Sequence, residues 1–140
     1  NNLPRILKSN YKADEKKKLV KNKLDIDKNI ILKEFTVIDA RSKERFEGNA
    51  AEPSTDLRRA SIENSYCLPF TDLINEDGTF AGKDKILEKF KTTKYDFNNN
   101  LVFTCGSGVT ASVLALAYSL IDNKYMPTIY DGSWSEYGKF

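Results

Sequence analysis

The segment Leu101–Ile121 constrains the fold of this chain more than any other. An apolar run, Leu101–Thr104, ends at Cys105, and a loop of glycine and small polar residues follows. From Ala111 to Ile121 the sequence is apolar on nearly every side of a helix. The first run predicts a buried strand and the second stretch a buried helix. Such a unit would place Cys105 in a tight loop at the carboxyl edge of a sheet.

The loop predicts a reactive thiol. Gly106 and Gly108 let the backbone approach a ligand closely. Backbone N–H groups of such a loop point inward, and the following helix end adds partial positive charge. A thiol held there ionises more readily than a free one and can act as a nucleophile. The alternative is an inert core thiol, since free cysteine is among the most buried residue types.

Short apolar runs alternate with helical stretches along the rest of the chain. This alternation predicts an α/β fold with a mostly parallel central sheet of about five strands and helices on both faces. Ligands of such sheets bind beyond the carboxyl ends of the strands, where Asp39, Cys105 and Asp131 fall. The other runs are Ile30–Leu32, Phe35–Asp39, Ser65–Phe70 and Thr128–Asp131, and the other helical stretches are Ser42–Phe46 and Lys83–Phe90.

Composition excludes several classes of function. A length of 140 residues suits one domain, which we place at residues 30–140, after a lysine-rich linker or arm at residues 1–29 with one helical turn. A net charge of +2 argues against nucleic acid, and the early lysines are interleaved with acidic residues, which favours a solvated face over an acidic partner. The chain has no histidine and two cysteines, which excludes a Cys–His pair and argues against a metal site. No run approaches the roughly 20 residues of a transmembrane segment.

Seven motifs occur in the same order as in one enzyme family. Together they resemble the catalytic half of the rhodanese-type sulfurtransferases, and the loop resembles that of the 3-mercaptopyruvate branch. Thiosulfate-preferring relatives carry a basic pair after the cysteine, where this chain has Gly106-Ser107. The motifs are Val37–Arg41, Arg45–Gly48, Glu52–Pro53, Leu57–Arg59, Pro69–Thr71, Cys105–Ala111 and Tyr130–Glu136.

The resemblance implies a persulfide cycle without a metal or organic cofactor. Cys105 would take sulfur from 3-mercaptopyruvate or thiosulfate and pass it to a thiol, a thioredoxin-like protein or cyanide. It also implies that the chain is the second of a tandem pair of rhodanese-like domains, with the first absent from this sequence. A mitochondrial or cytoplasmic location fits the composition.

The resemblance also implies roles for individual residues. Ser107 would belong to a Cys–Ser–Asp proton relay whose aspartate comes from the preceding domain; otherwise it is a small residue that fits a tight loop. Arg45 would bind the substrate carboxylate through its planar guanidinium; otherwise it is a surface arginine. The remaining loop residues that would contact the substrate are Gly106, Gly108, Val109 and Thr110.

Two departures from the family pattern bear on function. Ser54 stands where relatives carry a second carboxylate-binding arginine, for which Arg58 or Arg59 could compensate, and Ser61–Asn64 replaces a histidine-isoleucine-proline-glycine turn. A catalytically weak or inactive domain, kept as a binding or structural subunit of an assembly, is therefore the alternative. A cysteine phosphatase fits poorly, because its loop needs an arginine at the position of Ala111.

Three neighbouring residues are assigned structural roles. Arg41 follows a predicted strand end and is expected to form an ion pair. Trp134 follows the last strand, and packing is favoured over a place at the mouth of the pocket. Cys67 is expected to be a core residue.

Overall fold

Five parallel strands form the central sheet of the computed structural model, which describes residues 9–93 and 100–140. Their order across the sheet is β1-β5-β4-β2-β3. The central pair, β2 and β4, is in register from Phe35 opposite Asn100 to Asp39 opposite Thr104. The strands are β1 (Val20–Lys21), β2 (Phe35–Asp39), β3 (Tyr66–Cys67), β4 (Asn100–Thr104) and β5 (Ile129–Tyr130). The predicted parallel sheet is confirmed.

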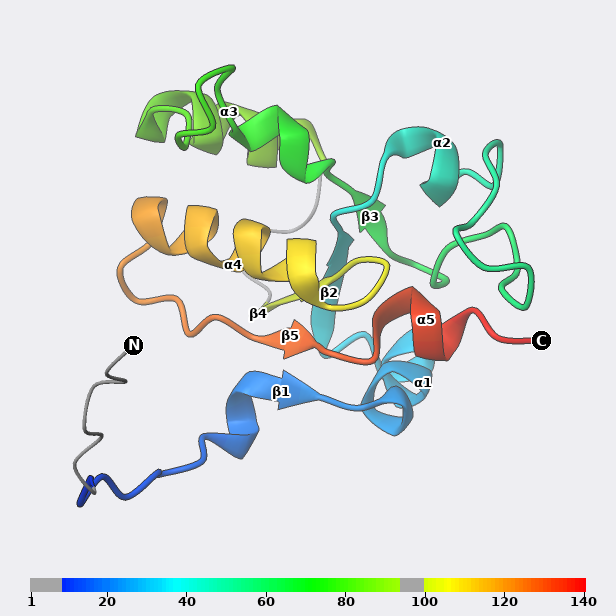
Figure 1. The fold of residues 1–140 in the computed structure, drawn as a ribbon, viewed down its shortest axis with the longest axis horizontal. Helices are drawn as coiled ribbons and strands as arrows, with labels where there is room; N and C mark the ends of the chain where they lie inside the picture. The colour runs from blue at the N-terminus through cyan, green and yellow to red at the C-terminus, as the bar shows by residue number, and fades with distance from the viewer. Residues whose placement is uncertain (1–8, 94–99) are drawn as a thin grey trace, which may run out of the picture.

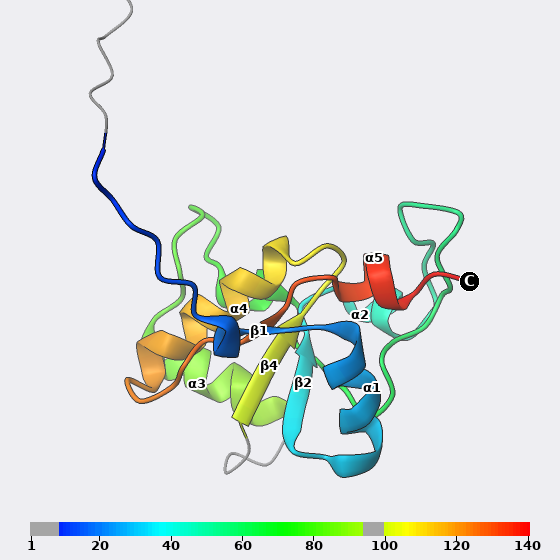
Figure 2. The same ribbon diagram turned by 90° about the horizontal axis from the view of Figure 1, so that it is seen from below.

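Helices cover both faces of this sheet, as predicted (Figures 1 and 2). Helices α3 (Lys83–Thr92) and α4 (Val109–Ile121) pack on one face, and α1 (Lys23–Leu32) and α5 (Ser133–Tyr137) pack on the other. The shorter elements are α2 (Lys43–Phe46) and the 3₁₀ turns Lys17–Leu19 and Phe70–Leu73. Within the two described ranges, no helix is long and apolar enough to cross a membrane.

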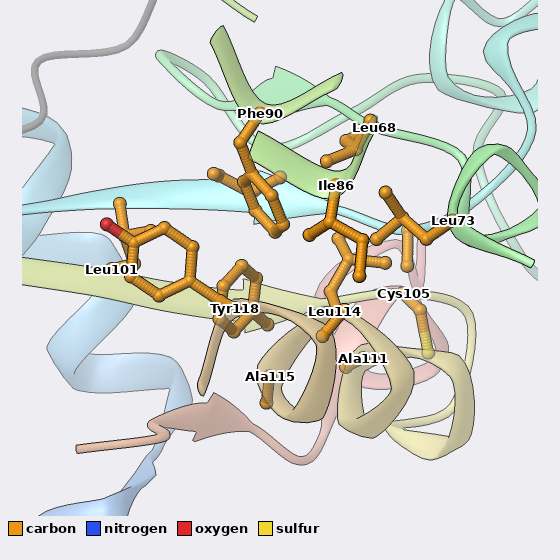
Figure 3. Packing of buried hydrophobic residues seen from close by; sticks show 14 of the residues in the cluster. Leu68, Leu73, Ile86, Phe90, Leu101, Cys105, Ala111, Leu114, Ala115 and Tyr118 are labelled. Atoms are coloured by element: carbon orange, nitrogen blue, oxygen red, sulfur yellow. The ribbon is translucent and has the colours of Figure 1, made fainter. Parts of the chain in front are cut away.

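The two hydrophobic cores follow from the alternation of side chains along β4. Leu101 and Phe103 join the cluster under α3 and α4, while Val102 joins the cluster under α1 and α5. Edge-to-face aromatic contacts fix the first cluster, with the Phe90 ring 6.1 Å from Phe103 and 4.9 Å from Tyr118. Cys105 continues the same face of β4 and lies at the edge of this cluster (Figure 3).

The N-terminal part of the sheet differs from the prediction. Ile30–Leu32 was expected to be a strand but lies in α1, and the fifth strand is β1, which pairs with β5. Helix α1 begins with a capping box, in which the side chains of Asn22 and Asp25 each accept a hydrogen bond from the other residue's N–H. Ile26 is fully buried in the second core. Residues 20–29, assigned to a linker from their polarity, therefore belong to the folded domain.

Candidate active site

The loop between β4 and α4 lies at the carboxyl edge of the sheet, where the sequence places it. Cys105 directly follows β4 and is 2% exposed, while Ser107 and Val109 are exposed on the outside of the loop. Gly108 has φ +83°, and a Cβ there would stand 2.8 Å from Oδ1 and 2.9 Å from the carbonyl oxygen of Asp131. Glycine is therefore required both by the backbone conformation and by the close approach of Asp131, the residue after β5. Helix α4 begins at Val109, two residues before the predicted start.

The Cys105 sulfur points toward the first turn of α4 and away from the aliphatic core (Figure 3). Burial on its own raises the pKa of this thiol, but hydrogen bonds to the sulfur outweigh burial and lower the pKa below its ordinary value. Among these donors the Thr110 side chain lowers the pKa most, followed by the backbone N–H groups of Ala111, Ser107 and Thr110. These donors stabilise the thiolate more than the thiol, so the loop favours the nucleophilic form.

The backbone of the loop is held from behind by the first residues of α5. The Cys105 N–H donates to Ser133 Oγ at 3.1 Å. The N–H of Trp134 donates to the Cys105 carbonyl at 2.9 Å, and the N–H of Ser135 donates to the Gly106 carbonyl at 2.8 Å. Ser133 was not predicted to contribute to the site, because its role depends on a contact between residues 28 positions apart in the sequence.

Arg45 lies against the loop but is already paired. A Cβ on Gly106 would be 3.2 Å from Arg45 Nη2, so the guanidinium borders the backbone beside Cys105. The same Nη2 donates to Glu52 Oε2 at 2.5 Å, and the Arg45 side chain keeps 27% exposure. The guanidinium is therefore oriented by a carboxylate and remains accessible at the loop.

Glu52 joins this arginine to a buried ion-pair network. Its other oxygen accepts from Arg41 Nη1 at 2.9 Å, and Arg41 Nη2 donates to Asp39 at 2.7 Å. The side chains of Arg41, Asp39 and Glu52 are each 1% exposed. The Trp134 ring packs over the Arg41 guanidinium at 4.5 Å. The ion-pair role of Arg41 and the packing role of Trp134 are thus confirmed.

The positions that depart from the family pattern lie in two places: Ser54 is two residues from Glu52, whereas the Asn64 side chain donates to the Ile30 carbonyl at 3.4 Å. Ser54 is exposed and its hydroxyl donates to Asp56. Arg58 is engaged, because its Nη2 donates to the Tyr137 carbonyl at 2.7 Å. Arg59 is exposed, as Arg58 is, and it lines the same surface pocket as Ser54. Asn64 adopts φ 60°, a left-handed conformation that asparagine tolerates in place of glycine.

Two further predictions concern Cys67 and Ser107. Cys67 is half-buried rather than part of either core, and burial raises its pKa to about 12, so it is a poor nucleophile. Within residues 9–93 and 100–140, the Ser107 hydroxyl makes no hydrogen bond to a carboxylate. Its part in a proton relay stays a prediction.

Two curated relatives and a family model place the chain among known proteins. The model of the rhodanese-like domain matches residues 12–139. The chain is 35% identical to human (Homo sapiens) 3-mercaptopyruvate sulfurtransferase over 127 residues, which cover 91% of this chain and 42% of that protein. It is 34% identical to Rattus norvegicus thiosulfate sulfurtransferase over 128 residues, or 91% of this chain and 43% of that protein. The chain thus spans less than half the length of these relatives.

Solved structures agree with the sequence relatives. The 3-mercaptopyruvate sulfotransferase SseA from Escherichia coli superposes with a TM-score of 0.72 at 29% identity, covering 90% of this chain and 46% of that one. A sub-stoichiometric sulfur transferase subunit of yeast mitochondrial complex I superposes with a TM-score of 0.72 at 32% identity, covering 86% and 42%. The parallel sheet, the cysteine loop and a family model that covers nearly the whole chain lead to one conclusion: the chain belongs to the family of rhodanese-like domains.

Proposed function

We propose that this chain is the catalytic domain of a sulfurtransferase, which carries a sulfane sulfur as a persulfide on Cys105. The donor is 3-mercaptopyruvate or thiosulfate, and the acceptor is a thiol, a thioredoxin-like protein or cyanide. The observation that carries the proposal is the position of Cys105 directly after β4, in a loop whose backbone is held by α5 and whose donors, from Thr110, Ala111 and Ser107, lower the pKa of the thiol. One of the curated relatives named above is a 3-mercaptopyruvate sulfurtransferase and the other a thiosulfate sulfurtransferase, which supports the reaction class.

The proposed cycle has two displacements at sulfur. The Cys105 thiolate attacks the sulfur of 3-mercaptopyruvate, the carbon–sulfur bond breaks, and the carbon takes up the thiol proton to give pyruvate. A thiolate acceptor then attacks the outer sulfur and leaves Cys105 as a thiolate again. Before and after each displacement Cys105 carries the negative charge on sulfur, as the thiolate or as the persulfide anion, within reach of the loop amides. The loss of one such donor can cost on the order of 10²-fold in rate. Ser107 is proposed to pass the proton.

Arg45 is proposed to bind the donor's carboxylate while the loop residues Gly106, Gly108, Val109 and Thr110 surround the reacting sulfur. The position of the Arg45 guanidinium against Gly106 supports this role of Arg45. Without a second arginine at Ser54, donor binding would be weaker by roughly 1.5–3 kcal/mol, or about ten- to hundredfold, than in relatives that have both. Arg59, in the pocket beside Ser54, can recover part of this difference.

A second rhodanese-like domain is proposed as a partner, because the chain spans less than half of its relatives. Exposed apolar residues of α4 (Val109, Leu116 and Leu120) start at the cysteine loop and offer a surface for it. No nucleic-acid partner is proposed, given the net charge of +2. A mitochondrial or cytoplasmic location is proposed, and a similar sulfurtransferase of Arabidopsis thaliana is named as mitochondrial.

The alternative is a domain of weak or no activity that serves as a subunit of an assembly. Two observations favour it. Ser54 replaces a substrate-binding arginine, and one structural relative is described as a subunit of yeast complex I. That same relative is described as a sulfur transferase, so the two roles need not exclude each other.

Thiocyanate formation from cyanide tests the proposal. The chain is assayed with 3-mercaptopyruvate and, separately, with thiosulfate, beside the variants Cys105→Ser and Cys67→Ser. We expect turnover with at least one donor, loss of it in Cys105→Ser, and retention of it in Cys67→Ser. Absence of turnover with both donors would favour the binding subunit.

A further inference from the structure

Ser133 combines a buried side chain with a disfavoured backbone conformation. Ser133 is fully buried, and its backbone adopts φ 50°. Residues other than glycine and asparagine seldom adopt this left-handed conformation. Glycine would adopt this conformation without strain. A residue that keeps a disfavoured backbone is held there by its surroundings, and such outliers cluster at functional sites.

The hydroxyl of Ser133 uses all of its hydrogen-bonding capacity. It donates to the Tyr130 carbonyl at 2.9 Å, and it accepts from the Cys105 N–H at 3.1 Å and from the Thr104 hydroxyl at 3.3 Å. A hydroxyl offers one donor and two acceptor sites, so no site is left over. The Ser133 hydroxyl is therefore held in one orientation, and its hydrogen bonds connect the end of β5 to the end of β4.

The neighbouring backbone bonds fix the remaining polar groups at the start of the loop. The Cys105 and Gly106 carbonyls accept from the N–H groups of Trp134 and Ser135. Both carbonyl oxygens are thereby directed to α5, while the amides of Ser107, Thr110 and Ala111 are directed to the sulfur. If the Cys105 N–H lost its acceptor, this buried donor would be unsatisfied and the peptide would turn to find another.

We propose that Ser133 is a positioning residue for the sulfur-transfer reaction: its hydroxyl fixes the Cys105 peptide so that the loop amides face the sulfur. The inference rests on the proposed function of Cys105 and adds a residue that touches neither donor nor acceptor. This role also explains the left-handed backbone of Ser133, because that conformation directs the hydroxyl to the Cys105 N–H.

Two substitutions separate a positioning role from mere packing. Ser133→Gly removes the hydroxyl and relieves the backbone, whereas Ser133→Ala removes the hydroxyl and keeps the disfavoured backbone. All variants carry Cys67→Ala, so that Cys105 is the only thiol. Ser119→Ala is the matched control, since its hydroxyl donates to the Leu116 carbonyl within its own helix, α4, at 2.7 Å. The readouts are the rate of alkylation of Cys105 by iodoacetamide as a function of pH, and the urea midpoint.

We expect the alkylation midpoint to move to higher pH in both Ser133 variants, and the rate at neutral pH to fall on the order of tenfold, the equivalent of one net hydrogen bond. Ser133→Gly should show this loss even though its urea midpoint is at least that of Ser133→Ala. A Ser133→Gly chain with the wild-type alkylation profile would overturn the inference and leave the proposed function intact. An ordinary free-cysteine midpoint in the chain with native Ser133 would overturn both.

Discussion

At the residue scale, the Cys105 thiol is the place where burial and hydrogen bonding oppose each other most directly. Burial favours the neutral thiol, while the donors of the loop favour the thiolate and lower the pKa. The balance depends on donors that belong to three residues, Ser107, Thr110 and Ala111, and only Thr110 contributes through its side chain. That side chain can therefore be changed without altering the backbone of the loop.

Replacing Thr110 with valine keeps the shape of the side chain and removes its hydroxyl. Because the hydroxyl lowers the pKa of Cys105, its loss should raise that pKa, so the acid limb of the pH–rate profile for sulfur transfer should move to higher pH. The rate at neutral pH should fall by about tenfold. A control is Thr92→Val, at an exposed position of α3. An unchanged profile in Thr110→Val would mean that the hydroxyl does not support the thiolate.

Glu52 is the residue on which the buried ion pairs depend. Glu52→Gln leaves Arg41 and Arg45 with one charged partner fewer, and we expect the free energy of unfolding to drop by about 1–3 kcal/mol. Because Arg45 loses its anchor, KM for 3-mercaptopyruvate should rise more than kcat falls. Urea unfolding and steady-state kinetics measure the two effects.

The matched control for this change is Glu47→Gln. Glu47 pairs with Lys43 at 3.7 Å on the surface, where 45% of its side chain is exposed, so its loss should change stability by less than about 0.5 kcal/mol. Equal effects at the two positions would contradict the importance of the buried network.

At the scale of elements, helix α1 tests whether residues 20–32 are part of the domain. Ile26 is fully buried and Ile31 is 81% exposed on the same helix. Ile26→Ala should therefore lower the free energy of unfolding by about 2–5 kcal/mol, and Ile31→Ala should change it by less than about 0.5 kcal/mol. Urea denaturation of both variants makes the comparison. Similar small effects would mean that α1 is a detachable arm, as its polar composition suggested.

Elements with strong local signals could be predicted from the sequence. The run Leu101–Thr104 and the apolar helix after it are recognisable because each is long enough to show its own pattern. Strand β1 has two residues, and the apolar run Ile30–Leu32 fits a helix as well as a strand, so local pattern could not assign either. The capping pair Asn22 and Asp25 is the signal that could have located α1.

The candidate site could be predicted only in part, for a related reason. Cys105 and its glycines lie within a few residues of one another, so the loop is a local motif. The bonds that orient the loop come from residues distant in the chain, such as Ser133. Pairings of this kind depend on how the sheet edge assembles, and no spacing in the sequence encodes them directly.

At the scale of the whole molecule, the C-terminal segment ties the cysteine loop to the rest of the fold. Helix α5 bonds to the loop through Trp134 and Ser135, and the Trp134 ring nitrogen donates to the Arg58 carbonyl at 2.9 Å. The Arg58 N–H in turn donates to the Gly138 carbonyl at 2.8 Å. The chain end, the segment before β3 and the loop therefore form one connected unit around the carboxyl edge of the sheet.

The location of the transferred sulfur tests the central claim most directly. The chain is incubated with 3-mercaptopyruvate or thiosulfate without an acceptor, digested, and the peptides that contain Cys105 and Cys67 are weighed by mass spectrometry. We expect Cys105 to gain one sulfur atom and Cys67 to stay unmodified. Addition of cyanide should remove that sulfur atom and yield an equal amount of thiocyanate. An unmodified Cys105 with both donors, or sulfur held by Cys67 instead, would contradict it.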